Sequence, residues 1–130
     1  TGRGEHLDIS MTEGALTFQL PALAAAADDP EQGPGMGILE GEAPAYDVYR
    51  TADDEFLAVG ALEPKFWSNV VQAIGEPGLI GGGLSQGEEG EEVRQRVAEL
   101  LATRTRDEWM ETFEGEDVCI EPVQSLEEVL

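Results

Sequence analysis

The sequence predicts an α+β domain preceded by a short arm. Two strand-like runs, residues 45–51 and 55–62, flank Asp53-Asp54, a pair that suits a tight hairpin turn. Amphipathic helical patterns follow, and apolar residues make up 41% of the chain, enough for a packed core. A hairpin and a further strand packed with helices are typical of the α+β class.

The beginning of the chain lacks the pattern of a closed domain. Residues 5–10 alternate like a short strand, and residues 12–27 are rich in helix formers around one proline. A strand and a helix alone cannot close a core, so we interpret residues 1–27 as the end of another, larger domain. Prolines and glycines recur in residues 28–42, which we predict to be a linker to a small domain at residues 43–130.

The helix predicted for residues 64–74 has clear limits. Pro64 suits the first helical position, where its missing N–H is harmless. Phe66 and Val70 share one face at helical spacing. Gly75 is a suitable C-terminal cap because glycine readily adopts the left-handed conformation there.

Residues 76–92 are mostly glycine and glutamate, and we predict a flexible insertion. They lack the lysine and hydroxyl pair of a phosphate-binding loop. Helical spacing returns in residues 91–102 and again in residues 107–113, where Trp109 and Phe113 lie one turn apart and are expected to stack.

The last part of the chain contains a strand and a helix start. Residues 118–120 form an apolar run that we predict to be a strand stopped by Pro122. Ser125 and Glu128 have the spacing of a capping box, which indicates a final helix.

The chain is strongly acidic. Its 28 acidic residues against seven basic ones, with Lys65 as the single lysine, give a net charge of -21. Such a surface repels phosphate backbones and anionic lipids, so we expect neither nucleic acid nor a membrane as a partner. An acidic, lysine-poor surface resembles halophilic proteins from a salt-rich cytoplasm, where counterions screen the repulsion. The acids alternate with apolar residues along the chain, which favours a folded domain over an acidic tail.

Cysteine and histidine are too few for several kinds of site. One cysteine, Cys119, and one histidine, His6, exclude an internal disulfide framework and a zinc cluster. A single cysteine agrees with a cytoplasmic location. No apolar run is long enough to span a bilayer. The sequence does not begin with methionine, which makes a truncated or proteolytic piece of a larger protein one interpretation.

Glu63 is the strongest candidate for chemistry. It lies where a strand ends and a helix begins, and the helix dipole favours a carboxylate there. The simpler alternative, favoured by the residue pattern alone, is that Glu63 only starts the helix. For His6 the simpler interpretation is a surface residue, and for Cys119 it is an inert core thiol.

Five segments in order carry a resemblance to a known family. They are residues 2–11 (GRGEHLDISM), 43–53 (APAYDVYRTAD), 57–67 (LAVGALEPKFW), 103–109 (TRTRDEW) and 117–123 (DVCIEPV). Together they resemble the alpha-methylacyl-CoA racemases of the class III coenzyme A transferases, a family that includes L-carnitine dehydratase-like proteins. The sequence departs from the family at Asp53-Asp54, where Asp-Gly is more usual.

The resemblance implies a fragment that covers mainly the small domain of an intertwined homodimer. The missing large domain is Rossmann-like and binds coenzyme A, and the site lies between the large domain of one subunit and the small domain of the other. The substrate is a 2-methylacyl-CoA thioester, with no further cofactor and no metal. Its α-proton exchanges through an enolate between an acid and a base on opposite faces.

The resemblance also implies roles for particular residues. Glu63 matches the glutamate that pairs with a catalytic histidine. That histidine and a catalytic aspartate are absent here, so the isolated fragment is expected to be inactive, and His6 matches a different position. Tyr46, Leu39 and Met11 match positions that line the acyl pocket, with core packing as the alternative.

Two alternatives stay open at this point. An acyl-CoA transferase or L-carnitine dehydratase-like member would use the missing aspartate as an acyl-carrying nucleophile. A non-enzymatic acidic interaction domain would leave Glu63 facing solvent, away from any pocket.

Overall fold

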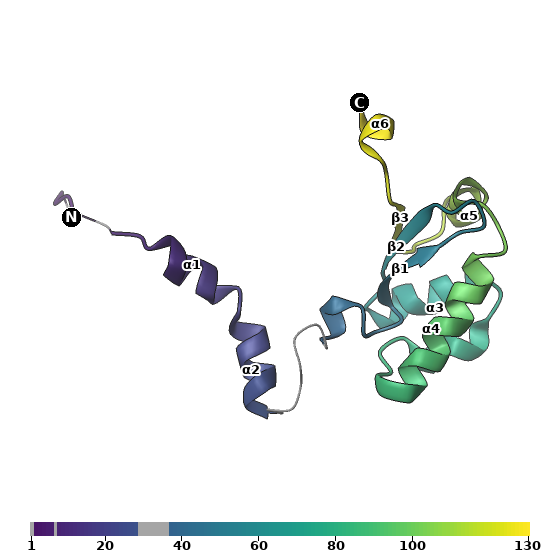
Figure 1. Ribbon diagram of the computed structural model, residues 1–130, viewed down its shortest axis with the longest axis horizontal. Helices are drawn as coiled ribbons and strands as arrows, with labels where there is room; N and C mark the ends of the chain where they lie inside the picture. Colours follow the sequence, from purple (N-terminus) through teal and green to yellow (C-terminus); the bar gives the residue numbers. More distant parts are fainter. Residues whose placement is uncertain (1, 7, 29–36) are drawn as a thin grey trace. The chain divides into compact units, whose positions relative to one another are not determined.

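The protein divides into two units, Thr1–Pro34 and Gly35–Leu130 (Figure 1). The structure is a computed structural model, and it describes three stretches of the chain: residues 2–6, 8–28 and 37–130. The division falls within residues 28–42, the predicted linker, of which residues 29–36 lie outside the described residues.

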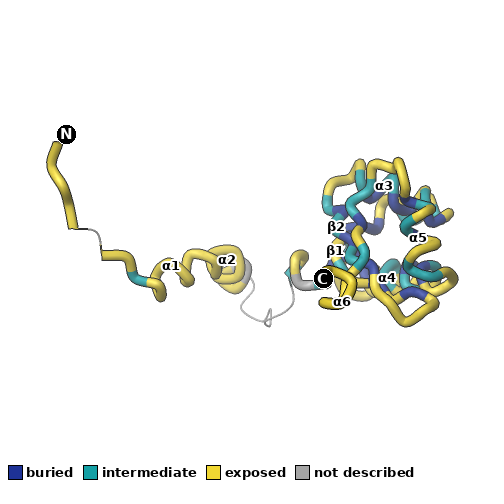
Figure 2. The backbone as a smooth tube through the Cα atoms, turned by 90° about the horizontal axis from the view of Figure 1, so that it is seen from above, coloured by how far each residue is buried: buried dark blue, intermediate teal, exposed yellow. Residues whose placement is uncertain are grey.

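The first unit contains two short helices, α1 (Met11–Thr17) and α2 (Leu20–Asp28). Ser10 caps α1, because its hydroxyl accepts a hydrogen bond from the Glu13 N–H. Pro21 is the second residue of α2, a position where its missing N–H costs no helical bond, so the break between the helices precedes the proline. The predicted helical segment is thus confirmed as two helices (Figure 2).

The strand predicted for residues 5–10 is wrong. The described residues of this segment have no regular structure, and Ile9 is largely exposed. A strand needs a neighbour to satisfy its backbone N–H and C=O groups. The described part of the first unit contains no strand that could pair with it. Alternation alone could not reveal this lack.

The second unit is built on an antiparallel sheet of β1 (Tyr46–Arg50), β2 (Phe56–Gly60) and β3 (Ile120–Pro122), in that order. The predicted hairpin is confirmed, with Arg50 opposite Phe56 at its turn end. Asp54 adopts a φ of 66° in this turn, a conformation that glycine adopts without strain. The Asp-Asp turn is therefore strained where an Asp-Gly turn would not be.

Six helical segments accompany the sheet. They are η1 (Ile38–Glu40), α3 (Pro64–Ala73), η2 (Pro77–Gly82), α4 (Gly87–Leu101), α5 (Arg106–Phe113) and α6 (Leu126–Val129), where η marks a 3₁₀ helix. Gly75, with a φ of 82°, ends α3 in a Schellman motif: its N–H donates to the Gln72 carbonyl, and the Glu76 N–H donates to the Val71 carbonyl. The predicted Ser125–Glu128 capping box begins α6.

The flexible insertion predicted for residues 76–92 is wrong, because the segment forms η2 and the first turns of α4. Its glycines allow close packing. A Cβ at Gly83 would lie 2.7 Å from the indole ring of Trp67, and a Cβ at Gly90 would lie 2.3 Å from the Ser85 carbonyl oxygen. The indole N–H of Trp67 also donates to the Leu79 carbonyl at 2.9 Å. Trp67 is therefore seated against this segment.

The last strand lies two residues later than predicted. Ile120 pairs with Val59, and Pro122 pairs with Leu57 as the final strand residue. Proline is tolerated there because β3 is an edge strand, whose outer N–H groups have no ladder partner. Cys119 precedes the strand, although its carbonyl accepts the Gly60 N–H at 2.8 Å.

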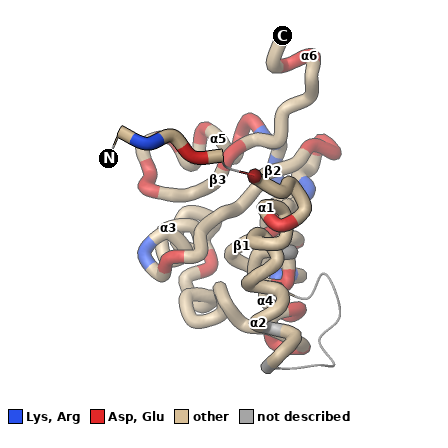
Figure 3. The backbone as a smooth tube through the Cα atoms, turned by 90° about the vertical axis from the view of Figure 1, so that its left-hand side faces the viewer, with Lys and Arg blue, Asp and Glu red and all other residues tan. Residues whose placement is uncertain are grey.

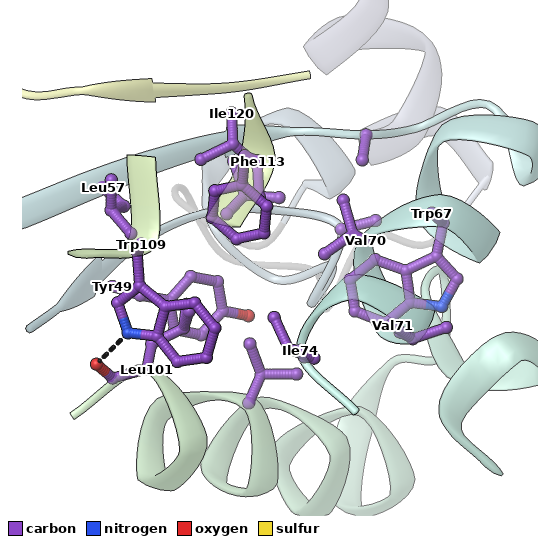
Figure 4. Close-up of a cluster of buried hydrophobic side chains, with 14 residues drawn as sticks. Tyr49, Leu57, Trp67, Val70, Val71, Ile74, Leu101, Trp109, Phe113 and Ile120 are labelled. Carbon is purple, nitrogen blue, oxygen red and sulfur yellow. Dashed lines mark hydrogen bonds between the residues drawn. The ribbon is translucent and has the colours of Figure 1, made fainter. Parts of the chain in front are cut away.

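One face of the sheet packs on the helices to form the core (Figure 4). Its fully buried members include Leu57 of the sheet, Val70 of α3 and Leu101 of α4. Trp109 and Phe113 of α5 stack with ring centroids 5.7 Å apart, as predicted, and the Trp109 indole N–H donates to the Leu101 carbonyl. The core thus joins the sheet to α3, α4 and α5, which confirms the α+β class.

Acidic residues recur along the second unit (Figure 3). Several of them converge on Arg106, whose side chain is only 13% exposed. Arg106 pairs with Glu55 of the hairpin turn and with Glu128 of α6, and it donates to the Val123 carbonyl at 2.9 Å. The hydrogen bond from Arg106 lowers the pKa of Glu128 to about 2. This network connects α5, the hairpin turn and the last helix.

Candidate functional site

The second face of the sheet is open and largely apolar. Side chains alternate along β1, so that Tyr49 enters the core while Tyr46 and Val48 are 37% and 53% exposed on the other face. The partners of these two residues on β2 are small: Gly60 lies opposite Tyr46, and Ala58 lies opposite Val48. The middle strand therefore forms a low floor beside a higher wall.

A cavity of about 710 Å³ occupies this floor. Its lining is mostly apolar, and its charged groups are the carboxylates of Asp47 and Glu121. It is lined by Leu39, Gly41, Tyr46, Asp47, Val48, Ala58, Val59, Gly60, Val118, Cys119 and Glu121. A space of this size, with a few polar groups among apolar side chains, is typical of a small-molecule site.

Arg94 of α4 fixes the segment around η1, which contributes Leu39 and Gly41 to the cavity lining. Its guanidinium donates to the carbonyls of Gly41 and Glu42 at 2.6 and 2.7 Å. Its Nε lies 3.1 Å from an Asp47 carboxylate oxygen, an ion pair that lacks the alignment of a hydrogen bond. The other Asp47 oxygen accepts the Val48 N–H at 2.7 Å. Arg94 therefore ties the segment before β1 to β1 itself.

Glu63 lies just past the end of the cavity floor. It is the N-cap residue of α3, with an extended backbone and no side-chain capping hydrogen bond. Its carboxylate is exposed and is not part of the cavity lining, although Gly60, three residues earlier in the chain, is. The predicted position between strand and helix is confirmed. A catalytic role for Glu63 stays a prediction.

The structure brings together two of the predicted acyl-pocket residues. Tyr46 and Leu39 line the same cavity, and Leu39 does so from within the predicted linker, residues 28–42. Met11 lies in the first unit, at the start of α1, and is 90% exposed. Its place in a pocket stays a prediction.

Sequence reasoning missed the cavity roles of Asp47, Arg94, Cys119 and Glu121. Glu121 could have been found by its alternation with buried Ile120, which places it on the open face. Arg94 carried no such signal, because its carbonyl partners lie more than fifty residues away in the chain.

A second hollow, of about 590 Å³, lies between α5 and β3. Acidic residues dominate its lining, among them Glu111, Glu114 and Glu116. Among the described residues, no group of three or more His, Cys, Asp or Glu side chains could hold a metal ion. Likewise, no helix in the described stretches combines the length and apolarity needed to cross a membrane.

The hairpin turn between β1 and β2 is not part of the cavity lining, and its contacts stabilise the fold. Asp53 accepts hydrogen bonds from the Thr51 hydroxyl at 2.6 Å and from the Arg106 N–H at 3.2 Å. The pKa of Asp53 is lowered, chiefly by the Thr51 bond and also by the Arg106 N–H. The hairpin turn is thereby fixed to the first turn of α5.

A sheet with one face packed on helices and the other hollowed into an apolar cavity defines this α+β domain. The family model described as CoA-transferase family III matches residues 1–130, and the chain belongs to that family. The chain is 37% identical over 134 residues to the alpha-methylacyl-CoA racemase of Mus musculus. It is 34% identical over 132 residues to the alpha-methylacyl-CoA racemase of Homo sapiens. Both matches cover the whole chain and 34% of the relative.

The fold agrees with a solved structure of the protein Rv3272 from M. tuberculosis. The TM-score is 0.65 at 19% sequence identity, over 93% of this chain and 32% of that one. The chain therefore spans about a third of the length of the racemases and of the solved structure that it matches. This agreement shows the fold.

Proposed function

We propose that this chain is the small-domain part of an acyl-CoA racemase that exchanges the α-proton of 2-methylacyl-CoA thioesters through an enolate. The observation that carries the proposal is the apolar cavity that Tyr46 and Leu39 both line. Strand β2 forms its floor and ends at Gly60, three residues before Glu63. The similarity to two racemases over the whole chain supports the same activity.

The cavity would hold the branched acyl group. Each methylene removed from water contributes about 0.8 kcal/mol, so an apolar floor and wall favour an alkyl chain over a polar one. Glu63 would act beside it as the partner of a catalytic histidine. Its carboxylate is available because it caps no helix N–H and makes no ion pair with a described residue. A positioned acid or base of this kind contributes about 10²- to 10⁴-fold to a proton transfer.

The chain supplies only part of the site. The catalytic histidine and aspartate implied by the family resemblance are not in this sequence, so the isolated chain is expected to be inactive. The rest of the site would come from a large coenzyme A-binding domain, with the site shared between the subunits of a homodimer. The coenzyme A thioester would be the substrate in the cytoplasm, with no further cofactor.

The test measures deuterium incorporation at the α-carbon of 2-methylacyl-CoA in heavy water. It uses the complete protein, with this chain joined to its large domain, at high salt. The Glu63→Gln variant is expected to lose about 10²-fold or more of the exchange rate. Glu127→Gln is the matched control, because Glu127 is an exposed acid on α6 outside the cavity lining.

Each alternative predicts a different result. Absence of exchange, together with transfer of the acyl group between coenzyme A acceptors, would favour the transferase or L-carnitine dehydratase-like alternative within the family. Neither exchange nor transfer would favour the acidic interaction domain, which also predicts the exposed Glu63.

A further inference from the structure

We propose that Glu121 sets the charge selectivity of the cavity on the open sheet face, admitting neutral acyl groups and disfavouring those that end in a carboxylate. The substrate class rests on the proposed function, whereas the charge effect at the cavity does not. Glu121 belongs to β3 and lies opposite Ala58, which in turn lies opposite Val48. The three residues form one row across the sheet.

This row places Glu121 at the rim of the apolar floor, where it also lines the second hollow, between α5 and β3. Directly opposed residues of an antiparallel pair have Cβ atoms about 5 Å apart, so Glu121 stands beside the small side chain of Ala58. Val48 and Tyr46 form the wall on the other side of β2. A group lying on the floor therefore has apolar side chains on one side and Glu121 on the other.

Glu121 is the carboxylate of the lining that no cation offsets. The other lining carboxylate, Asp47, pairs with Arg94 and accepts the Val48 N–H. Within the described residues, no ion pair or hydrogen bond involves the Glu121 side chain. The cavity lining contains no Lys, Arg or His. A ligand with a negatively charged group on the cavity floor is thus repelled by Glu121, and no cation of the lining offsets this repulsion.

Cys119 provides a reporter that needs no catalysis. It is the single cysteine of the chain, it lines the cavity, and it precedes Glu121 by two residues. Residues two apart on an extended chain face the same side and are about 7 Å apart. At a distance of about 7 Å in a water-like dielectric, the charge of Glu121 changes the concentration of a singly charged reagent at Cys119 about threefold relative to bulk solution, when the ionic strength is low.

The first measurement is the rate at which Cys119 in the full chain reacts with two methanethiosulfonates, one carrying a sulfonate and one a trimethylammonium group. Glu121→Gln should raise the ratio of the anionic reagent's rate to the cationic reagent's rate about tenfold, because a charge effect of about threefold acts on each reagent in opposite directions. The change should fall below about twofold in 1 M salt, where the screening length is about 3 Å. A structural effect of the substitution, or any other change in the reactivity of the thiol, would multiply both rates alike and leave their ratio unchanged.

Glu127→Gln is the control and should leave the ratio as in the wild type. An unchanged ratio in Glu121→Gln at low salt would overturn the proposal. Failure of Cys119 to react in the folded chain, while it reacts after unfolding, would also overturn it, because the thiol would then not face the open cavity.

The second measurement uses the complete protein and two 2-methylacyl-CoA thioesters of equal chain length, one ending in a methyl group and one in a carboxylate. Glu121→Gln should raise kcat/KM for α-proton exchange of the anionic thioester about threefold and leave the neutral one within twofold. Exchange of the two thioesters in an unchanged ratio would refute the selectivity. A shift in thiol reactivity without exchange of either thioester would support the charge effect and count against the proposed racemase instead.

Discussion

Replacing Gly83 by alanine tests whether the glycine-rich segment is packed or flexible. The added Cβ would lie 2.7 Å from both Cγ and Cδ1 of Trp67, closer than side-chain atoms approach in folded proteins. Trp67 cannot easily yield, because it is 3% exposed and its indole N–H is bonded to the Leu79 carbonyl. Overpacking of this kind costs about 1–3 kcal/mol. In a unit of this size that lowers Tm by roughly 5–20 °C.

The assay is urea and thermal unfolding of the chain, followed by circular dichroism and by tryptophan fluorescence. Gly81→Ala is the matched control from the same glycine triplet, since a Cβ there meets nothing within 4 Å and the backbone carries no positive φ. It should unfold at the wild-type midpoint or slightly above, because alanine restricts the unfolded chain. Equal unfolding midpoints for the two variants would refute the packing argument and favour the alternative that residues 76–92 are a flexible insertion.

Two further predictions concern the hairpin turn. Asp54→Gly should stabilise the chain by about 1 kcal/mol, because glycine adopts the φ of 66° without strain. The substitution also removes the ion pair with Arg50, which is exposed and contributes little. A lower unfolding midpoint for the variant would contradict this prediction. Asp53 has a lowered pKa in the folded chain, so its contribution to stability is complete above its ordinary pKa of 3.8 and is lost as the pH falls through the lowered value. Urea midpoints measured from pH 7 to 3 should therefore fall less steeply for Asp53→Asn than for the wild type, and parallel profiles would exclude the effect.

Local signals in the sequence were reliable where neighbouring residues decide the structure. Pro64 begins α3 and Gly75 ends it, because a fixed φ and a left-handed φ are properties of those residues alone. The Ser125–Glu128 box formed as predicted, since its hydrogen bonds span only three residues. The hairpin was predictable for the same reason.

Part of the site was predictable, by the same local reasoning together with the family resemblance. Glu63 was placed correctly between strand and helix, and Tyr46 and Leu39 share one cavity. The resemblance selected these residues. The period-2 alternation of β1 explains why Tyr46 faces away from the core.

The α+β class, the limits of the capped helices and the hairpin could be predicted from the amino-acid sequence, because each follows from contacts between residues close in the chain. The packing role of the glycines in residues 76–92 is visible only in the folded protein, where a Cβ at Gly83 would collide with the Trp67 ring. The same is true of the cavity. The Gly41–Glu42 segment beside the cavity is held by Arg94, which binds its carbonyls from more than fifty residues away in the chain. The floor depends on the strand register that sets Glu121 beside Ala58. Contacts between residues distant in the chain are created by folding, and a linear pattern does not contain them.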